Sequence, residues 1–304
     1  MGIKERLKNT IKYGGPKEVI RKGFFSVIYN RQGKRTKREV VGADMEYGLN
    51  KEPREHHIVV SLTSFPARFF KIGMCLKSLI LQTVKPDRII VYLGNDCTES
   101  DITEEMKSYE AYGVEFRIDG EKNLKPHKKY YYAMREFPDS IVVTADDDVF
   151  YPREWMQKLY DSYLRHPKAV NAWRVHYIQM KNGRIQPYNY WIDQIRSVRK
   201  PSKRLIAIGN GGILYPPGIF DDDLFETDAI ESLCLGADDL WLKCHEIRKN
   251  VPVVWVKSMK VDPVPIPSEK SLSSENVFTG KNDKILREIM DYLKLDDSDF
   301  LDRE

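Results

Sequence analysis

The chain has 304 residues, of which 41% are hydrophobic, so it can bury the core of one large domain or two small ones. Its 49 basic and 45 acidic side chains give a net charge of +4, a balance that argues against nucleic acid as the main partner. No apolar run reaches the roughly 20 residues that cross a bilayer, there is no signal-peptide core, and the four cysteines lack zinc-like or disulfide-rich spacing; these features predict a cytoplasmic location.

The N-terminus is strongly basic. Residues 1–40 hold twelve Lys or Arg and three acids, and apolar residues at helical spacing predict two short amphipathic helices. Such helices fit peripheral contact with the anionic inner face of a membrane, and they fit a helical hairpin packed on the main domain equally well. Residues 31–55 show little periodicity and are expected to form a linker, so residues 1–50 form a basic extension.

From residue 57 onward, predicted strands and helices alternate. Apolar runs predict strands at 57–62, 88–93, 114–118 and 140–145, and amphipathic segments between them predict helices through 74–81, at 101–111 and at 128–137. This order predicts an α/β fold with a doubly wound, mostly parallel sheet, in which ligands bind at the carboxyl ends of the strands.

The second half of the chain is more mixed. We expect a helix at 155–163, aromatic strands around 170–178 and 188–192, a glycine-rich turn at 209–218, a helix near 238–248, a strand at 251–256 and a final helix around 282–294. The main domain is therefore assigned to residues 51–270, with halves at about 56–150 and 151–270, and residues 271–304 form a C-terminal loop and helix.

Three adjacent carboxylates, Asp146, Asp147 and Asp148, follow the predicted strand at 140–145. They repel one another unless a cation or solvent offsets their charge. Mg²⁺ or Mn²⁺ commonly takes one or two carboxylates together with substrate phosphates, so alternate acids at a strand end form a natural diphosphate anchor. Which two of the three acids bind the metal is open, and Asp146 and Asp148 are favoured. The alternative is a solvated acidic turn or a helix N-cap, because Pro152 and Glu154 indicate a helix start nearby.

Several segments together resemble bacterial capsule and exopolysaccharide glycosyltransferases of the GT-A fold, over roughly residues 56–285. They are HIVVSLTSFPAR, ILQTVKPDRIIVYL, KKYYYAMREFPDSIVVTADDDVFYP, GGILYPPG and GADDLWLK. The resemblance implies a metal-dependent transferase that uses a nucleotide diphosphate sugar, with Asp146 and Asp148 in the positions of the Asp-x-Asp motif.

The resemblance also implies a nucleotide-binding loop after the first strand, formed by Thr63, Ser64, Phe65 and Arg68. The guanidinium of Arg68 can make paired hydrogen bonds to phosphate or to a base edge, although an exposed arginine that caps the loop is the alternative. Asp96, at the end of the second strand, matches an acidic residue that contacts uracil or ribose.

Two further sets of residues flank the predicted donor site. Lys128 and Lys129 lie on the helix that leads into the acidic strand and fit either diphosphate neutralisation or a solvated basic face. Gly211 and Gly212 resemble a segment that lies under the donor sugar, since residues without a Cβ let the backbone approach a ligand; a hairpin turn is the alternative.

Asp238 and Asp239 precede an apolar Leu-Trp-Leu run. In the inverting relatives a carboxylate here takes the proton from the acceptor hydroxyl, which implies Asp239 as the base and Asp238 as sugar ligand or alternate base. Acids are also favoured in the first turn of a helix. The aromatic residues Tyr188, Tyr190 and Trp191, with Trp173 and His176, fit an acceptor saccharide site, with core packing expected for Trp173.

The predicted reaction is thus an inverting transfer from a UDP-hexose, with Mn²⁺ or Mg²⁺, to a saccharide or lipid-linked oligosaccharide acceptor. UDP-galactose, UDP-glucose and UDP-galactofuranose remain open as donors. A sugar-phosphate nucleotidyltransferase is one alternative, but the first strand is not followed by a glycine-rich triphosphate loop. A non-catalytic metal- and membrane-binding protein is the other, although the acidic segment lacks the pattern of an EF-hand.

Overall fold

The computed structural model describes residues 31, 33–118, 120, 122–256, 262–266 and 280–302. Its strands are β1 (Ile58–Thr63), β2 (Arg88–Leu93), β3 (Val114–Ile118), β4 (Ile141–Asp146), β5 (Val149–Phe150), β6 (Val170–Ala172), β7 (Val175–Tyr177), β8 (Met180–Lys181), β9 (Arg184–Ile185), β10 (Leu205–Ala207), β11 (Ile213–Tyr215), β12 (Val253–Trp255) and β13 (Val264–Pro265).

The α-helices are α3 (Phe69–Ile80), α4 (Glu104–Ser108), α5 (Lys128–Glu136), α6 (Trp155–Arg165), α7 (Thr227–Ala229), α8 (Asp238–Arg248) and α10 (Lys281–Leu293). Short 3₁₀ turns are η2 (Pro66–Arg68), η3 (Glu99–Asp101), η4 (Tyr109–Tyr112), η5 (Lys125–His127), η6 (Tyr188–Tyr190), η7 (Gly209–Gly211), η8 (Asp222–Phe225) and η10 (Asp297–Phe300), and η9 (Ile230–Cys234) is a π-helical turn.

A seven-stranded sheet in the order β12-β6-β11-β4-β1-β2-β3 forms the centre of the fold. Strands β3, β2, β1 and β4 are mutually parallel, β11 runs antiparallel between β4 and β6, and β12 is parallel to β6. Thr63 pairs with Asp146, so β1 and β4 end at the same edge. The predicted mostly parallel, doubly wound α/β fold is confirmed, and the edge predicted to bind ligand holds the three acids.

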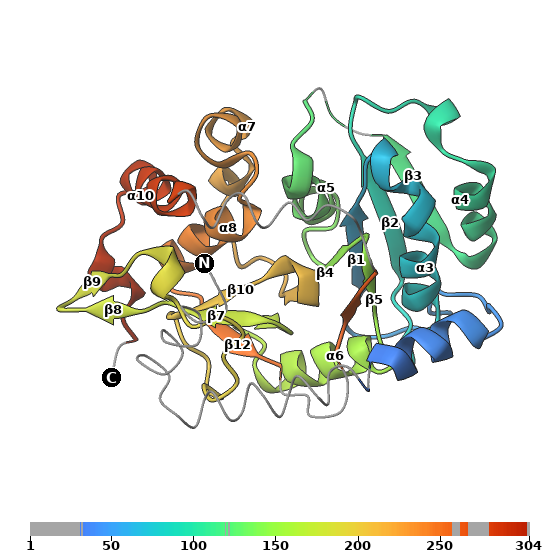
Figure 1. The fold of residues 1–304 in the computed structure, drawn as a ribbon, viewed down its shortest axis with the longest axis horizontal. Coiled ribbons are helices and arrows are strands. Elements are labelled where there is room, and N and C mark those ends of the chain that lie inside the picture. Colours follow the sequence, from blue (N-terminus) through green and yellow to red (C-terminus); the bar gives the residue numbers. More distant parts are fainter. Residues whose placement is uncertain are drawn as a thin grey trace.

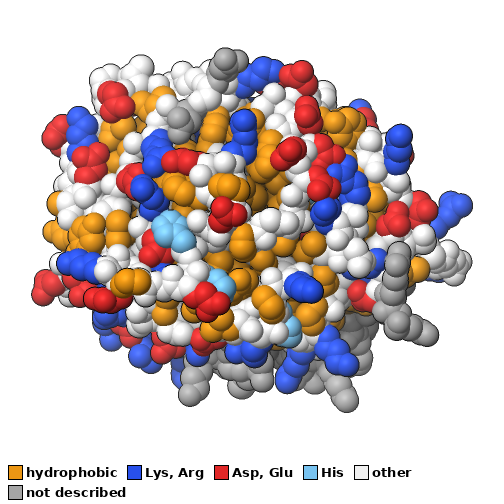
Figure 2. All heavy atoms as spheres, turned by 180° about the vertical axis from the view of Figure 1, so that it is seen from behind, with side chains coloured by type: hydrophobic (Ala, Val, Ile, Leu, Met, Phe, Trp, Pro, Cys, Tyr) orange, Lys and Arg blue, Asp and Glu red, His pale blue; other side chains and the backbone are white. Residues whose placement is uncertain are grey.

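Alternating apolar residues bury both faces of the sheet. Val60 and Leu62 pack with α3 and α6 on one face, whereas Val59 packs with Ala133 of α5 on the other. Figure 1 shows α3 and α4 beside the β1–β3 end of the sheet, and α8 between α10 and β10. Acidic and basic side chains are interspersed on the face in Figure 2.

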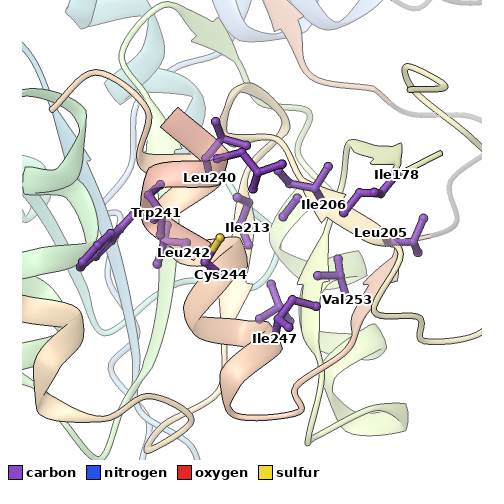
Figure 3. Packing of buried hydrophobic residues seen from close by; sticks show 14 of the residues in the cluster. Ile178, Leu205, Ile206, Ile213, Leu240, Trp241, Leu242, Cys244, Ile247 and Val253 are labelled. Atoms are coloured by element: carbon purple, nitrogen blue, oxygen red, sulfur yellow. The ribbon is translucent and has the colours of Figure 1, made fainter. Parts of the chain in front are cut away.

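Helix α8 is buried for most of its length, which fixes the position of its first turn. Leu240, Trp241, Leu242, Cys244 and Ile247 lie in one hydrophobic cluster with residues of β10, β11 and β12 (Figure 3). Burying a large apolar side chain contributes about 1.5–3 kcal/mol. Packing of these side chains therefore fixes the helix in place, and with it the two acids at its N-terminus.

Three predicted elements differ from the structure. Residues 33–42 form a helix whose Val40 is 1% exposed, so the linker predicted for 31–55 is wrong for this part, whereas residues 43–50 form no helix or strand. Residues 1–30, where the two amphipathic helices were predicted, lie outside the described residues. The strand predicted at 188–192 is the turn η6, because Pro187 precedes it and Ile192 makes a single bridge to Tyr177. The helix predicted at 101–111 is broken into η3, α4 and η4, whose caps include Thr98 and Thr103.

In the described ranges, no helix is both long and apolar enough to cross a membrane. The closing loop expected around 271–279 lies outside those ranges. The C-terminal helix is present as α10, and Asn282 and Asp283 lie in its first turn, after the N-cap Gly280.

Candidate functional site

The three adjacent acids after β4 have different environments. Asp147 is 4% exposed, and its carboxylate accepts hydrogen bonds from the Ser64 hydroxyl at 2.6 Å and from Arg68 Nη1 at 2.7 Å. Burial raises the pKa of Asp147 to about 6, against the opposing effect of these two partners. The side chains of Asp146 and Asp148 are each 27% exposed, so both remain accessible from outside the protein.

Buried groups fix the backbone around Asp146. The Tyr151 hydroxyl accepts a hydrogen bond from the Asp146 N–H at 2.8 Å, and Cys75 Sγ lies 3.2 Å from the Asp146 carbonyl oxygen. Tyr151 packs against Trp155, and both are fully buried. The sheet and this aromatic pair therefore hold the acidic turn in place, which a ligand site requires.

Arg68 lies at the end of η2, next to the acids. Its Nη1 is 2.7 Å from Asp147 and 3.2 Å from Asp148, and its guanidinium lies 5.3 Å from the centre of the half-exposed Phe65 ring. Burial lowers the pKa of Arg68, but the neighbouring carboxylates outweigh that effect and raise it. The hydroxyl of Thr63, in contrast to the Arg68 guanidinium, donates its hydrogen bond to the Tyr92 carbonyl and so links β1 to β2.

Lys129 joins the acids after β4 to those of α8. Its side chain is 7% exposed, and Nζ lies 3.1 Å from Asp146 Oδ1 and 2.9 Å from Asp238 Oδ2. Burial lowers the pKa of Lys129, yet the carboxylates outweigh burial and raise it well above its ordinary value. Burial likewise opposes the charge of Asp238, but Lys129 holds the pKa of Asp238 below its usual value.

Asp239 is the partner of a backbone amide. The Gly209 N–H donates to Asp239 Oδ1 at 3.2 Å. Burial, followed by the neighbouring Asp238 carboxylate, raises the pKa of Asp239 well above its ordinary value. A half-buried carboxyl with a raised pKa, next to a second acid, is a common arrangement for a general base.

The glycine-rich turn contributes a residue that the sequence reasoning did not select. A Cβ on Gly209 would lie 2.7 Å from Lys129 Nζ, 3.5 Å from Asp239 Oδ1 and 3.6 Å from Asp146 Oδ1, so Gly209 is at the centre of the site. Gly211 and Gly212 instead pack against Arg174 and Trp155. The GNGG pattern was the available signal for Gly209, and the expected approach of the Gly211 and Gly212 backbone to a donor sugar stays a prediction.

Asp96, which follows β2, and Lys128, the first residue of α5, interact electrostatically. Asp96 is exposed after β2, while Lys128 is buried and donates to Asn123 Oδ1 at 2.9 Å. Burial lowers the pKa of Lys128, against the effect of Asp96. Lys128 thus points toward the β2 end of the sheet, while Lys129 points toward the acids.

Tyr188 lies near Asp239 and is tied to α10. The ring centres of Tyr188 and Trp191 lie 4.6 Å apart. Burial raises the pKa of Tyr188, and the nearby Asp239 carboxylate adds to this effect. Asp283 Oδ1 accepts a hydrogen bond from the Tyr188 N–H at 2.6 Å, which ties this turn to α10. Trp173 lies in the core, as expected, and its indole N–H donates a hydrogen bond to Asp262.

The donor set of the acids fits a hard divalent cation. Asp146 and Asp148 offer carboxylate oxygens, the ligands that Mg²⁺ and Mn²⁺ prefer, whereas both oxygens of Asp147 are hydrogen-bonded. Within the part of the chain that the structure describes, no three His, Cys, Asp or Glu side chains form a ready-made metal centre. A cavity of about 440 Å³ lies at the opposite edge of the sheet, lined by Phe137, Ser140 and Tyr215 among others, and none of the candidate site residues lines it.

Comparison with known proteins gives a family match over part of the chain. Residues 71–220 match the profile of glycosyl transferase family 2. A search of curated proteins returned no match.

Three solved structures resemble this chain, each with a TM-score below 0.5. A chain of TarS from S. aureus (residues 1–349), in complex with UDP-GlcNAc, is 16% identical with a TM-score of 0.47, over 78% of this chain and 65% of that one. The mannosyltransferase PcManGT from Pyrobaculum calidifontis, in complex with GDP-Man and Mn²⁺, is 12% identical with a TM-score of 0.46, over 96% and 81%. 4-Diphosphocytidyl-2C-methyl-D-erythritol synthase is 10% identical with a TM-score of 0.43, over 71% and 95%.

Proposed function

We propose that this chain, a glycosyltransferase of the GT-A fold, transfers a hexose from a UDP-sugar to a saccharide or lipid-linked saccharide acceptor with inversion at the anomeric carbon. The resemblance of its motifs to capsule and exopolysaccharide enzymes supports a role in synthesis of such a polymer. The donor hexose remains to be chosen among galactose, glucose and galactofuranose.

One observation carries the proposal: the strand-end acids and the acids of α8 meet around Gly209. The site of a Cβ on Gly209 is 3.6 Å from Asp146 Oδ1 and 3.5 Å from Asp239 Oδ1. These two acids are 93 positions apart in the sequence. A diphosphate anchor and a base in such proximity suit a substitution in which a leaving group and a nucleophile act on one carbon.

The donor is assigned to Asp146, Asp148 and Arg68. A bound Mn²⁺ or Mg²⁺ would be held by Asp146 and Asp148 and would offset the charge of the departing diphosphate. Arg68, beside Asp148, is placed to contact nucleotide phosphate or base, and the exposed part of Phe65 offers an apolar surface next to it. Asp147 keeps Ser64 and Arg68 in position.

Asp239 is assigned as the base. It takes the proton of the acceptor hydroxyl while that oxygen bonds to the anomeric carbon and the bond from this carbon to the diphosphate oxygen breaks. The Gly209 N–H orients the carboxylate. The aromatic turn at Tyr188 and Trp191 lies on the Asp239 side and is assigned to the acceptor saccharide, whose ring faces stack on such side chains.

The test is a donor-hydrolysis and transfer screen across nucleotide sugars, with and without Mn²⁺. We expect release of UDP that requires the cation, and NMR of the product should show an inverted anomeric centre. A retained anomer would contradict the assignment of Asp239 as base. Formation of a nucleotide sugar and pyrophosphate from a nucleoside triphosphate and a sugar 1-phosphate would favour a nucleotidyltransferase.

We further propose that residues 1–40 attach the enzyme to the anionic inner face of a membrane. In the described part, Lys34, Arg35, Lys37 and Arg38 are exposed on the helix 33–42, whose opposite side is buried through Thr36 and Val40. Each basic residue near an anionic surface contributes about 1 kcal/mol. In flotation with vesicles of anionic lipid, deletion of residues 1–40 should abolish binding; equal flotation of the truncated and full chains would refute this role.

A further inference from the structure

The N-terminal end of α5 is linked to the segment that leads into α8 at three places. Lys122, in the preceding loop, forms ion pairs with Asp228 and Glu231. His127 Nε2 lies 2.9 Å from the Cys234 carbonyl, and Lys129 is paired with Asp238. The deepest of these links is Lys129, and it is the one that also reaches the acids after β4.

The ammonium of Lys129 is closely surrounded. Asp146 and Asp238 lie at 3.1 and 2.9 Å, and a Cβ on Gly209 would lie only 2.7 Å from Nζ, so the absence of a side chain at Gly209 makes room for the ammonium. The residue itself is 6% exposed. From the sequence, Lys129 fitted either diphosphate neutralisation or a solvated basic face, and its burial contradicts the solvated face.

We propose that Lys129 is a positioning residue that ties the donor-binding acids to the helix that bears the base. It rests on the proposed function and deepens it. By pairing with Asp238, Lys129 fixes the first turn of α8, so that Asp239 faces the acceptor and Asp238 does not compete for the same place. By pairing with Asp146, it sets the separation between diphosphate anchor and base. A displacement of about 1 Å in such a site can cost about 10²-fold in rate.

A double-mutant cycle tests this role. For Lys129→Met, Asp238→Asn and the double variant, kcat for transfer and the affinity for UDP in the presence of Mn²⁺ are measured. We expect each single variant to lower kcat about 100-fold and the double variant to fall no further, because the two residues act through one contact. UDP affinity should stay close to that of wild type. The double variant also guards against misfolding, since it removes the unpaired buried charge of Asp238 that Lys129→Met alone would leave.

Lys243→Met is the matched control. Lys243 is also buried, at 1% exposure, and pairs with Glu246 at 3.1 Å within α8. The Lys243→Met substitution should lower the thermal unfolding temperature without changing kcat of the folded enzyme. Multiplicative losses in the double variant, or a large loss of UDP affinity in Lys129→Met, would overturn the positioning role in favour of direct diphosphate contact. A wild-type protein that neither binds UDP nor transfers sugar would instead refute the proposed function.

Discussion

At the scale of single residues, identical side chains in one short run differ because of where each points. Asp147 is turned into the protein and bonded to Ser64 and Arg68, whereas Asp146 and Asp148 stay partly exposed. Asp238 and Asp239 repeat this division: one is paired with Lys129 and the other accepts from the Gly209 backbone. Strand and helix geometry turns neighbouring side chains in different directions, so the acids of each group have different partners.

Removal of the base should separate binding from chemistry. Asp239→Asn keeps the shape of the side chain but cannot accept the proton, so we expect kcat for transfer to fall about 10²–10⁴-fold. UDP binding in the presence of Mn²⁺, measured by calorimetry, should stay near that of wild type. Asp222→Asn, an exposed acid outside the site, is the control. A variant that retained more than a tenth of the wild-type kcat would show that another group is the base.

Gly212 should tolerate no side chain. Its φ is +86°, and a Cβ would lie 2.2 Å from the buried Trp155 ring, so Gly212→Ala should destabilise the fold by about 2–4 kcal/mol in urea denaturation. Gly218→Ala shares the positive φ of +65° but meets nothing within 4 Å, and should cost about 1 kcal/mol. Equal costs for the two variants would exclude packing on Trp155 as the reason.

At the scale of elements, α8 carries Asp238 and Asp239 in its first turn, and the rest of the helix is mostly buried. Besides its apolar side chains it buries Lys243, His245 and Glu246. The π-helical turn η9 and the three residues after it deliver the chain to Asp238. Such turns often occur at functional sites, and here the irregular segment lies next to His127 and Lys122.

His245 should make stability depend on pH. Burial lowers its pKa from 6.5 to about 4, against the opposing effect of Asp223, 3.6 Å away. Between these two pH values the unfolded chain binds more protons than the folded chain. The free energy of unfolding should therefore be highest above about pH 6.5 and decrease by up to about 3 kcal/mol as the pH drops toward 4.

The measurement is urea denaturation at a series of pH values. His245→Gln removes the titrating group, so its stability should change less with pH over this window, whatever its absolute value. Parallel curves for wild type and variant between pH 6.5 and 4 would show that His245 is not responsible.

At the scale of the whole molecule, the site lies where the parallel part of the sheet meets its mixed part. Strand β4 supplies one set of acids, and the antiparallel β11 beside it follows the glycine-rich turn that reaches α8. The segment 262–266 adds a further tie, because Ile266 N–H donates to the Asp148 carbonyl at 2.7 Å. Several distant parts of the chain are thus needed to assemble one site.

Donor and cation together should therefore stabilise the whole fold. With UDP at about 100 times its Kd in the presence of Mn²⁺, we expect about 2.7 kcal/mol of added stability and a higher unfolding temperature in a thermal shift assay. EDTA should remove most of the effect, and Asp148→Ala should abolish it. An equal shift in EDTA would show that the nucleotide binds without a cation.

The repeating parts of the fold could be predicted because their signals are local. Apolar strands such as Arg88–Leu93 and the buried helix Asp238–Arg248 agree with the expected ranges, since their periodicity reflects burial on known faces. Aromatic-rich residues 188–192 were misassigned because strand preference there depends on neighbours that the sequence does not display. The helix 33–42 was missed because its few buried contacts interrupt a mostly charged sequence.

The sequence by itself determined the order of strands and helices between residues 57 and 146, the three acids at the end of a buried strand and the two acids at the start of a buried helix. Tertiary structure alone decided which acid of each group is sequestered, that Lys129 lies between Asp146 and Asp238, and that Gly209 lies among them while Gly211 and Gly212 serve packing. The reason is physical: periodicity records which face of an element is buried, whereas the partner of a polar group depends on distances between segments far apart in the chain.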